Sequence, residues 1–178
     1  MQLIEALSEI TQGVDQPIIA IDGPAGAGKT TLASTIFLAL SPHMSTTVIH
    51  MDELYPGWEG AIGEELTKTL TWLTSCHKAK KPLLYSSFNW ATNEFHPPKT
   101  HASTQLLILE GVASAQLSIE ESLATSIWLD LDPLIGFQRV IDRDGENISQ
   151  EMKQWLVNQE QHFAADRTKE RCEFLLST

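Results

Sequence analysis

The sequence predicts a three-layer α/β/α fold, in which helices cover both faces of a five-stranded parallel sheet. Short apolar runs alternate along the chain with longer segments whose apolar residues recur at helical spacing. A glycine-rich stretch lies directly between the first apolar run and the first long helical segment. The chain has 178 residues, 42% hydrophobic and 20% charged, so we expect one domain over residues 1–178.

The helices are predicted from apolar periodicity and from residues that begin or end helices. A short amphipathic helix through Leu7 is expected to end near Gly13. Pro42 ends the next helix, Asp132-Pro133 begins a later one, and Ser149 is expected to cap the last. The longer predicted helices cover residues 29–40, 60–80, 133–143 and 149–167.

The strands are predicted from short apolar runs, which are typical of strands buried on both faces of a parallel sheet. The five runs cover residues 17–22, 46–51, 105–109, 126–131 and 172–176. A hairpin is expected over residues 83–95, after Pro82. The helices that separate the five runs favour parallel connections between them.

The charge balance limits the partners of the chain. Twelve Lys and Arg against 23 Asp and Glu give a formal net charge of −11, which disfavours nucleic acids and anionic membrane surfaces. No apolar stretch is long enough to span a bilayer, and the first ten residues do not resemble a secretory signal. Cys76 and Cys172 are far apart, so we expect reduced thiols in a cytoplasmic protein that is a monomer or homodimer.

The glycine-rich stretch is a complete phosphate-binding loop. Gly23-Pro24-Ala25-Gly26-Ala27-Gly28-Lys29-Thr30 matches G-x-x-x-x-G-K-[ST] between a strand and a helix, which is the context that the P-loop NTPase fold requires. Glycines let backbone amides approach phosphate, and the helix N-terminus adds positive charge. We expect Lys29 to bridge the outer phosphates of ATP, Thr30 to ligate Mg²⁺ and Thr31 to join the nucleotide contacts.

Four acidic residues follow predicted strands and could meet in one crevice, because ligands of open parallel sheets bind at the carboxyl ends of the strands. These are Asp22, Asp52, Glu110 and Asp132. A kinase that acts on a hydroxyl group needs one carboxylate to deprotonate it and another near the metal. Asp52 and Glu110 suit these two roles.

The order of these motifs resembles the uridine kinase branch of the P-loop kinases, and in particular its short members that carry M-D-[DE]-L-Y-P-G-W. The matching residues are the loop, His50-Met51-Asp52-Glu53-Leu54-Tyr55, Leu109-Glu110-Gly111-Val112, and Arg139 and Arg143 before Asp144-Gly145. The resemblance covers nearly the whole chain. It implies a kinase that transfers the γ-phosphoryl group of ATP to a nucleoside or another small alcohol.

The resemblance also implies roles for individual residues. Asp52 would be the general base, Glu110 would lie near Mg²⁺, and Arg139 and Arg143 would reach the phosphates from a lid over about residues 139–150. Arg167 belongs to a segment, 160–168, that is shared with the short members and could touch the nucleotide.

The acceptor residues depart from the family pattern. Relatives have Tyr-Asp-Trp or Tyr-Asp-Phe where this chain has Phe88-Asn89-Trp90, so an amide replaces a carboxylate that accepts hydrogen bonds from sugar hydroxyls. Asn89, Trp90 and Tyr55 are candidate acceptor-binding residues. Tyr55 and Trp58 could line the acceptor pocket, although Pro56-Gly57 equally predicts a simple turn.

Each of these assignments has a structural alternative. Asp52 could cap a turn, Glu110-Gly111 could be an ordinary strand-end turn, and Asp22 could hold the shape of the loop. Arg139 and Arg143 could form ion pairs on a solvated helix. The whole chain could also be a nucleotide-binding regulatory ATPase without a small-molecule acceptor, or, less consistently with its motifs, a motor or transporter ATPase.

Overall fold

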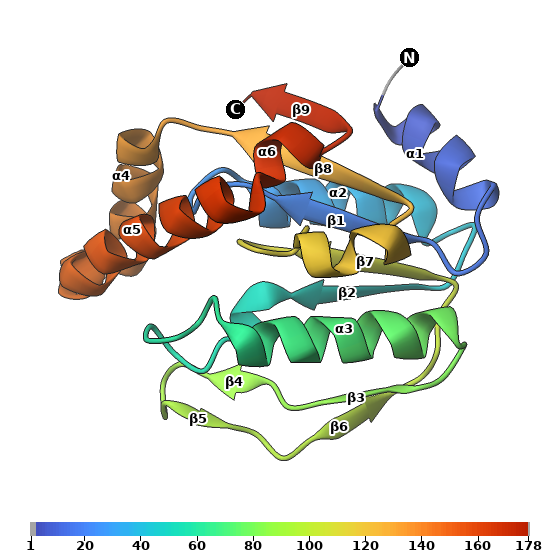
Figure 1. The fold of residues 1–178 in the computed structure, drawn as a ribbon, viewed down its shortest axis with the longest axis horizontal. Coiled ribbons are helices and arrows are strands. Elements are labelled where there is room, and N and C mark those ends of the chain that lie inside the picture. Colours follow the sequence, from blue (N-terminus) through green and yellow to red (C-terminus); the bar gives the residue numbers. More distant parts are fainter. Residues whose placement is uncertain (1–2, 178) are drawn as a thin grey trace.

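The computed structural model describes residues 3–177. Its central sheet has the order β2-β7-β1-β8-β9, and each pair of neighbouring strands is parallel (Figure 1). The strands are β1 (Ile18–Asp22), β2 (Thr46–His50), β7 (Leu106–Glu110), β8 (Thr125–Asp130) and β9 (Phe174–Ser177). The predicted five-stranded parallel sheet is therefore confirmed, with strand ends that shift by one or two residues.

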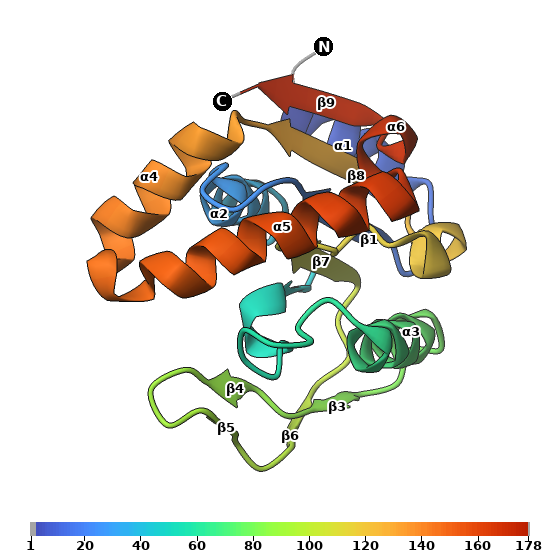
Figure 2. The ribbon, with the colours of Figure 1, turned by 60° about the vertical axis from the view of Figure 1, so that its left-hand side comes forward.

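Helices cover both faces of the sheet, as the sequence predicted (Figure 2). The helices α1 (Leu3–Gln12) and α2 (Lys29–Leu40) pack on one face, while α3 (Glu64–Lys78) and α5 (Ser149–Asp166) pack on the other. Successive residues of β1 point to opposite faces of the sheet. Ile18 packs on the face covered by α3, and Ile19 packs on the face covered by α2. Each fully buried isoleucine contributes about 1.5–3 kcal/mol of transfer free energy.

The remaining helices lie beside the carboxyl ends of the strands and near the last strand. They are α4 (Pro133–Asp144) and α6 (Thr168–Arg171), and short 3-10 turns form η1 (Met51–Glu53), η2 (Leu117–Ser122) and η3 (Glu146–Ile148). Asp132 caps α4 as predicted, because its carboxylate accepts from the amides of Leu134 and Ile135. Within residues 3–177, no helix combines the length and the apolarity that a membrane crossing requires.

Three sequence predictions of local structure need correction. The helix predicted over residues 60–80 begins only at Glu64, because Gly60 has a positive φ of 67° and Gly63 is extended. Ser149 does not cap α5, because η3 precedes it directly and the backbone of Ser149 is already helical.

The third correction concerns the hairpin predicted over residues 83–95, which is part of a longer antiparallel arm. In this arm β3 (Leu83–Tyr85) pairs with β6 (Lys99–His101), and β4 (Phe88–Asn89) pairs with β5 (Glu94–Phe95). Pro97 and Pro98 lie between β5 and β6 and interrupt the antiparallel ladder of the arm, because proline has no amide hydrogen to donate. Cys76 and Cys172 are both buried free thiols.

Candidate active site

The phosphate-binding loop joins β1 to α2 and is enclosed by neighbouring backbone. A Cβ atom at Gly26, which has a φ of 78°, would lie 2.5 Å from the carbonyl oxygen of Gly136 in α4. A Cβ atom at Gly136 would in turn lie 2.4 Å from the carbonyl oxygen of Ala25. The loop and α4 therefore touch through two glycines, and a side chain at either position would force them apart. Within residues 3–177, no side chain caps the N-terminus of α2, which leaves its first turn open to an anion.

Lys29 and Thr30 begin α2 and point in different directions. The Lys29 ammonium donates to the carbonyl oxygens of Gly23 and Pro24, each at 2.8 Å, and its side chain is buried. Burial lowers the pKa of Lys29, while the carboxylates of Asp22 and Glu110 oppose that shift. The Thr30 hydroxyl donates to the Glu110 carboxylate at 3.1 Å. Thr30 and Glu110, which the sequence analysis places near Mg²⁺, thus contact each other, and both line the same cavity.

His50 contacts Glu110 directly, which the sequence did not predict. The parallel register of β2 and β7 places His50 opposite Glu110, and the His50 Nδ1 atom forms a short hydrogen bond with the Glu110 carboxylate. This bond raises the pKa of His50, and its partial burial opposes the shift. The available signal in the sequence was that His50 lies near the end of one predicted strand and that Glu110 directly follows another.

Asp52 lies in η1, immediately after β2, and faces the same cavity. Its carboxylate is open to solvent, but the surrounding walls remove part of its hydration and raise its pKa, and the charge of Glu110 adds to the rise. A Cβ atom at Gly111, whose φ is 136°, would lie 2.5 Å from the Cβ atom of Met51. The loops that carry Asp52 and Glu110 therefore approach each other at a glycine.

The two arginines of α4 have different positions. Arg143 lines the cavity, and its guanidinium also forms a two-point ion pair with Asp144, at 2.7 and 2.6 Å. Arg139 does not line the cavity; its Nη1 atom donates to the carbonyl oxygen of Gly26 at 3.3 Å, on the loop itself. The structure thus places Arg143 at the site and Arg139 against the outside of the phosphate loop.

The rest of the cavity wall is mainly aromatic, with Val112, Val140 and Met152 beside the rings. Trp58 packs edge-to-face against Trp90 and Trp155, with ring centroids 5.2 and 6.0 Å apart, and Tyr55 packs against Trp155 at 5.1 Å. The Tyr55 hydroxyl donates to the Val112 carbonyl oxygen at 2.7 Å, and the Trp90 indole donates to the Asp52 carbonyl oxygen at 2.9 Å. We call Tyr55, Trp58, Trp90 and Trp155 the acceptor half. We call the phosphate-binding loop, together with Lys29, Thr30, His50 and Glu110, the donor half. The cavity that they share has a volume of about 240 Å³.

Several predicted contact residues lie elsewhere. Asn89 does not line the cavity, because its side-chain oxygen accepts from the amides of Ala91 and Thr92 and closes a turn. Thr31 is exposed on α2, and Arg167 is exposed with a left-handed φ of 53° between α5 and α6. Gly23, Pro24 and Ala27 shape the loop without lining the cavity. In this structure the amide that replaces the family carboxylate is a turn residue rather than a cavity residue.

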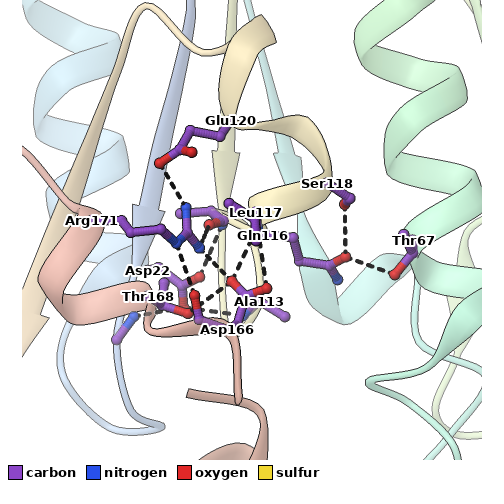
Figure 3. A network of polar contacts seen from close by, with 12 residues as sticks. Asp22, Thr67, Ala113, Gln116, Leu117, Ser118, Glu120, Asp166, Thr168 and Arg171 are labelled. Atoms are coloured by element: carbon purple, nitrogen blue, oxygen red, sulfur yellow. Dashed lines mark hydrogen bonds and ion pairs between the residues drawn. The ribbon is translucent and has the colours of Figure 1, made fainter. Parts of the chain in front are cut away.

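Asp22 holds the donor half in place from behind. Its fully buried carboxylate accepts from the amides of Gly23, Ala113 and Ala115, at 2.8, 3.0 and 2.9 Å (Figure 3). Burial raises the pKa of Asp22, although hydrogen bonds from Ala115 and Gly23 oppose the rise. Of the two alternatives for Asp22, the structure therefore favours the structural one.

The loop after β7 is also fixed from the C-terminal side (Figure 3). Arg171 donates to the Ala115 carbonyl oxygen at 2.9 Å and pairs with the carboxylates of Asp166 and Glu120. Asp166 accepts from the amide of Leu117 at 3.1 Å. The polar network thus connects the phosphate loop, through Asp22 and residues 113–117, to the junction of α5 and α6.

The residues present fit a polyphosphate with Mg²⁺. Thr30 and Glu110 supply hard oxygen donors within 3.1 Å of each other, at the open N-terminus of α2. Across residues 3–177, no group of three or more His, Cys, Asp or Glu side chains could hold a metal ion. Magnesium commonly binds through one or two protein ligands, water and substrate phosphates, so this donor set suits it.

Comparisons with known proteins identify the fold. No protein-family model and no curated protein matches the chain. Among solved structures, the chain is similar to a "possible uridine kinase" from Bacillus stearothermophilus, at 17% identity and a TM-score of 0.65, over 97% of this chain and 96% of that one.

It is also similar to a "putative fructose transport system kinase" from Silicibacter sp. TM1040, at 17% identity and a TM-score of 0.62, over all of both chains. At identities this low, the structural similarity establishes a shared fold alone. The chain therefore shares the fold of these two structures over nearly its entire length.

Proposed function

We propose that the chain is an ATP-dependent kinase of the uridine kinase-like branch that phosphorylates a hydroxyl group of a small molecule. One observation carries this proposal: Asp52 lines the same cavity as Lys29, Thr30 and Glu110 of the donor half. A phosphate loop alone is common to many nucleotide-binding proteins. A carboxylate with a raised pKa, facing that loop across a small cavity, is the additional group that transfer to an alcohol requires.

In the proposed reaction, the acceptor hydroxyl attacks the γ-phosphorus of ATP and Asp52 takes its proton. A bond forms between the acceptor oxygen and phosphorus, and the bond from phosphorus to the oxygen that bridges the β- and γ-phosphates breaks, which releases ADP. Bound Mg²⁺ would neutralise charge on the phosphates. Lys29 would exchange its carbonyl partners for phosphate oxygens, and Arg143 would offer a second cation from α4.

The proposal is supported by the different contacts of the two carboxylates that line the cavity, Asp52 and Glu110. Thr30 and Glu110 form one polar contact, whereas the side chain of Asp52 forms no hydrogen bond with either of them within the described residues. His50 pairs with Glu110 and would orient that carboxylate toward the metal. Asp52 is then the carboxylate that stays available to an acceptor hydroxyl.

The test compares wild type with the variants Asp52→Asn and Glu53→Gln on a panel of alcohols. We expect Asp52→Asn to reduce acceptor-dependent ADP release by about 10²–10⁴-fold while ATP affinity is kept, because only the general base is lost. Glu53→Gln removes a neighbouring charge outside the cavity and should change the rate little. Tight ATP binding without any acceptor-dependent ADP release would favour a nucleotide-binding regulator and would overturn the kinase proposal.

A further inference from the structure

Beyond the reacting end, the aromatic wall of the cavity offers no carboxylate or amide side chain within residues 3–177, and its unpaired side-chain donors are the indole NH groups of Trp58 and Trp155. The Tyr55 hydroxyl and the Trp90 indole NH are already committed to backbone carbonyl oxygens, at 2.7 and 2.9 Å. Trp58 and Trp155 pack with their rings against these two. The other wall residues there are Val112, Val140 and Met152, which are apolar.

The four charged side chains of the cavity lie near one another, because the charges of Glu110, Asp52 and Arg143 all act on Lys29. Lys29, Glu110 and Arg143 surround the space in front of the phosphate loop, and Asp52 faces the position of the reacting hydroxyl. Asn89, which could have bound sugar hydroxyls, is closed into a turn by the amides of Ala91 and Thr92. An acceptor would therefore find Asp52 as the partner of its reacting hydroxyl. For the rest of its body it would find π faces and two indole NH donors, but no carboxylate or amide group to accept its hydrogen bonds.

A polyol or a nucleoside would be poorly accommodated by this wall. Each further hydroxyl or base edge that enters without a partner loses its hydrogen bonds to water, at a cost of about 1–3 kcal/mol. The cavity volume of about 240 Å³, which includes the space in front of the loop, also lies below the range of about 300–1,000 Å³ that is usual for drug-sized ligands. A compact flat ring can instead stack on one indole and meet the edges of the others.

We propose that the acceptor is a small primary alcohol carried on a flat aromatic ring, rather than a polyol, a sugar or a nucleoside. This inference rests on the proposed kinase function, and it names the substrate class of the same site. The reacting hydroxyl meets Asp52, and the ring is held by Trp58 and Trp90.

The first arm of the test measures binding without turnover. Benzyl alcohol, cyclohexylmethanol, choline, ribose and uridine are titrated separately into the protein with Mg²⁺ and a non-hydrolysable ATP analogue, and thermal shift and tryptophan fluorescence are followed. We expect benzyl alcohol to bind more tightly than cyclohexylmethanol by about two- to tenfold, because only the aromatic ring gains ring-to-ring contacts of this strength. Ribose and uridine should give no shift at the same concentrations.

The second arm replaces the stacking residue and measures ADP release with ATP. Trp58→Leu should raise KM for benzyl alcohol by about two- to tenfold with little change in kcat, and Trp58→Phe should restore most of the affinity. Trp72→Leu is the matched control, because Trp72 is 58% exposed on α3 and lies outside the cavity. An equal KM in the Trp58→Leu and Trp72→Leu variants would overturn the inference.

The outcomes separate the two proposals. Preferential binding or phosphorylation of ribose, uridine or choline overturns the aromatic-alcohol inference and leaves the kinase proposal standing. Binding of benzyl alcohol without ADP release in its presence supports the binding site and counts against the kinase reaction. Failure of every alcohol to bind, while the ATP analogue does bind, overturns the inference.

Discussion

The two halves of the cavity are built by different means. The donor half is positioned mainly by backbone: the loop is fixed by amides that bind Asp22 and by glycine contacts with α4. The acceptor half is positioned mainly by side chains, whose aromatic rings pack on one another and whose polar atoms bind backbone carbonyl oxygens. Backbone geometry demands particular residues at particular spacings, whereas ring packing accepts many sequences. Backbone geometry therefore leaves a recognisable sequence motif, whereas ring packing leaves none.

The largest expected effect tests whether backbone contacts hold the donor half. Asp22→Ala leaves the buried amides of Gly23, Ala113 and Ala115 without their acceptor. We expect a loss of at least about 2 kcal/mol in the free energy of unfolding, because each unsatisfied amide costs about 1–3 kcal/mol and relief of the desolvated charge returns part of it. Denaturant unfolding measures this loss. Asp15→Ala, at an exposed ion pair, is the control and should change stability by less than about 0.5 kcal/mol.

The next effect tests the contact between the phosphate loop and α4. In Gly136→Ala, the new methyl group would lie 2.4 Å from the Ala25 carbonyl oxygen, so the loop or the helix must move. Overpacking of this kind costs about 1–3 kcal/mol, and we expect ATP affinity to fall by about tenfold. Calorimetric titration measures it. Gly13→Ala, where a methyl group meets its nearest atoms at 3.6 Å, should leave affinity unchanged. An unchanged affinity in Gly136→Ala would mean that α4 does not support the loop.

These contrasts explain how much the sequence could predict. The phosphate loop, the α/β/α layers and the cavity positions of Lys29, Thr30, Asp52 and Glu110 followed from a motif, apolar periodicity and the rule that parallel strands end at one edge. His50 was missed because its role depends on the register between β2 and β7, which no single strand specifies. The antiparallel arm was only partly predicted, because its pairing joins residues on both sides of Pro97 and Pro98.

The acceptor half was harder to predict because its chemistry depends on which polar atoms are already paired. From sequence, Tyr55 and Asn89 each carry a hydrogen-bonding group that could meet a ligand. In the structure, Tyr55 lines the cavity with its hydroxyl committed, and Asn89 closes a turn. Whether a side chain donates to a substrate or to a distant carbonyl oxygen is decided by tertiary packing, which short-range patterns do not encode.

A smaller effect concerns the pH dependence of the reaction at the boundary of the two halves. In the proposed reaction, Asp52 would act as a base only when ionised, so kcat/KM should fall as pH drops through its pKa. Burial and the charge of Glu110 raise that pKa above the ordinary value of 3.8. Glu110→Gln removes the negative charge that adds to this rise, so the fall in kcat/KM at acid pH should move to lower pH. A pH profile of kcat/KM measures the shift, with Glu53→Gln as the control. If kcat/KM falls at the same pH in Glu110→Gln and in wild type, that fall does not report the ionisation of Asp52.

The smallest effect tests the residue at which the chain departs from its relatives. Asn89→Asp keeps the oxygen that accepts from Ala91 and Thr92, so we expect stability to change by less than about 0.5 kcal/mol. Because position 89 does not line the cavity, the restored carboxylate should not create uridine phosphorylation. ADP release with uridine, in the variant and in wild type, measures this. A clear gain with uridine would show that the turn opens and that residue 89 reaches the acceptor.

The close approach of Gly111 to Met51 has a consequence for how such an enzyme could change. One absent methyl group sets the spacing between the loops of Asp52 and Glu110, and a Cβ atom there would stand 2.5 Å from that of Met51. That contact does not involve Trp58, whereas Trp90 is tied to the loop of Asp52 by its hydrogen bond to the Asp52 carbonyl oxygen. In the proposed kinase, mutational drift or laboratory selection could therefore replace Trp58, and with it the preferred alcohol, while the spacing between Asp52 and Glu110 is kept.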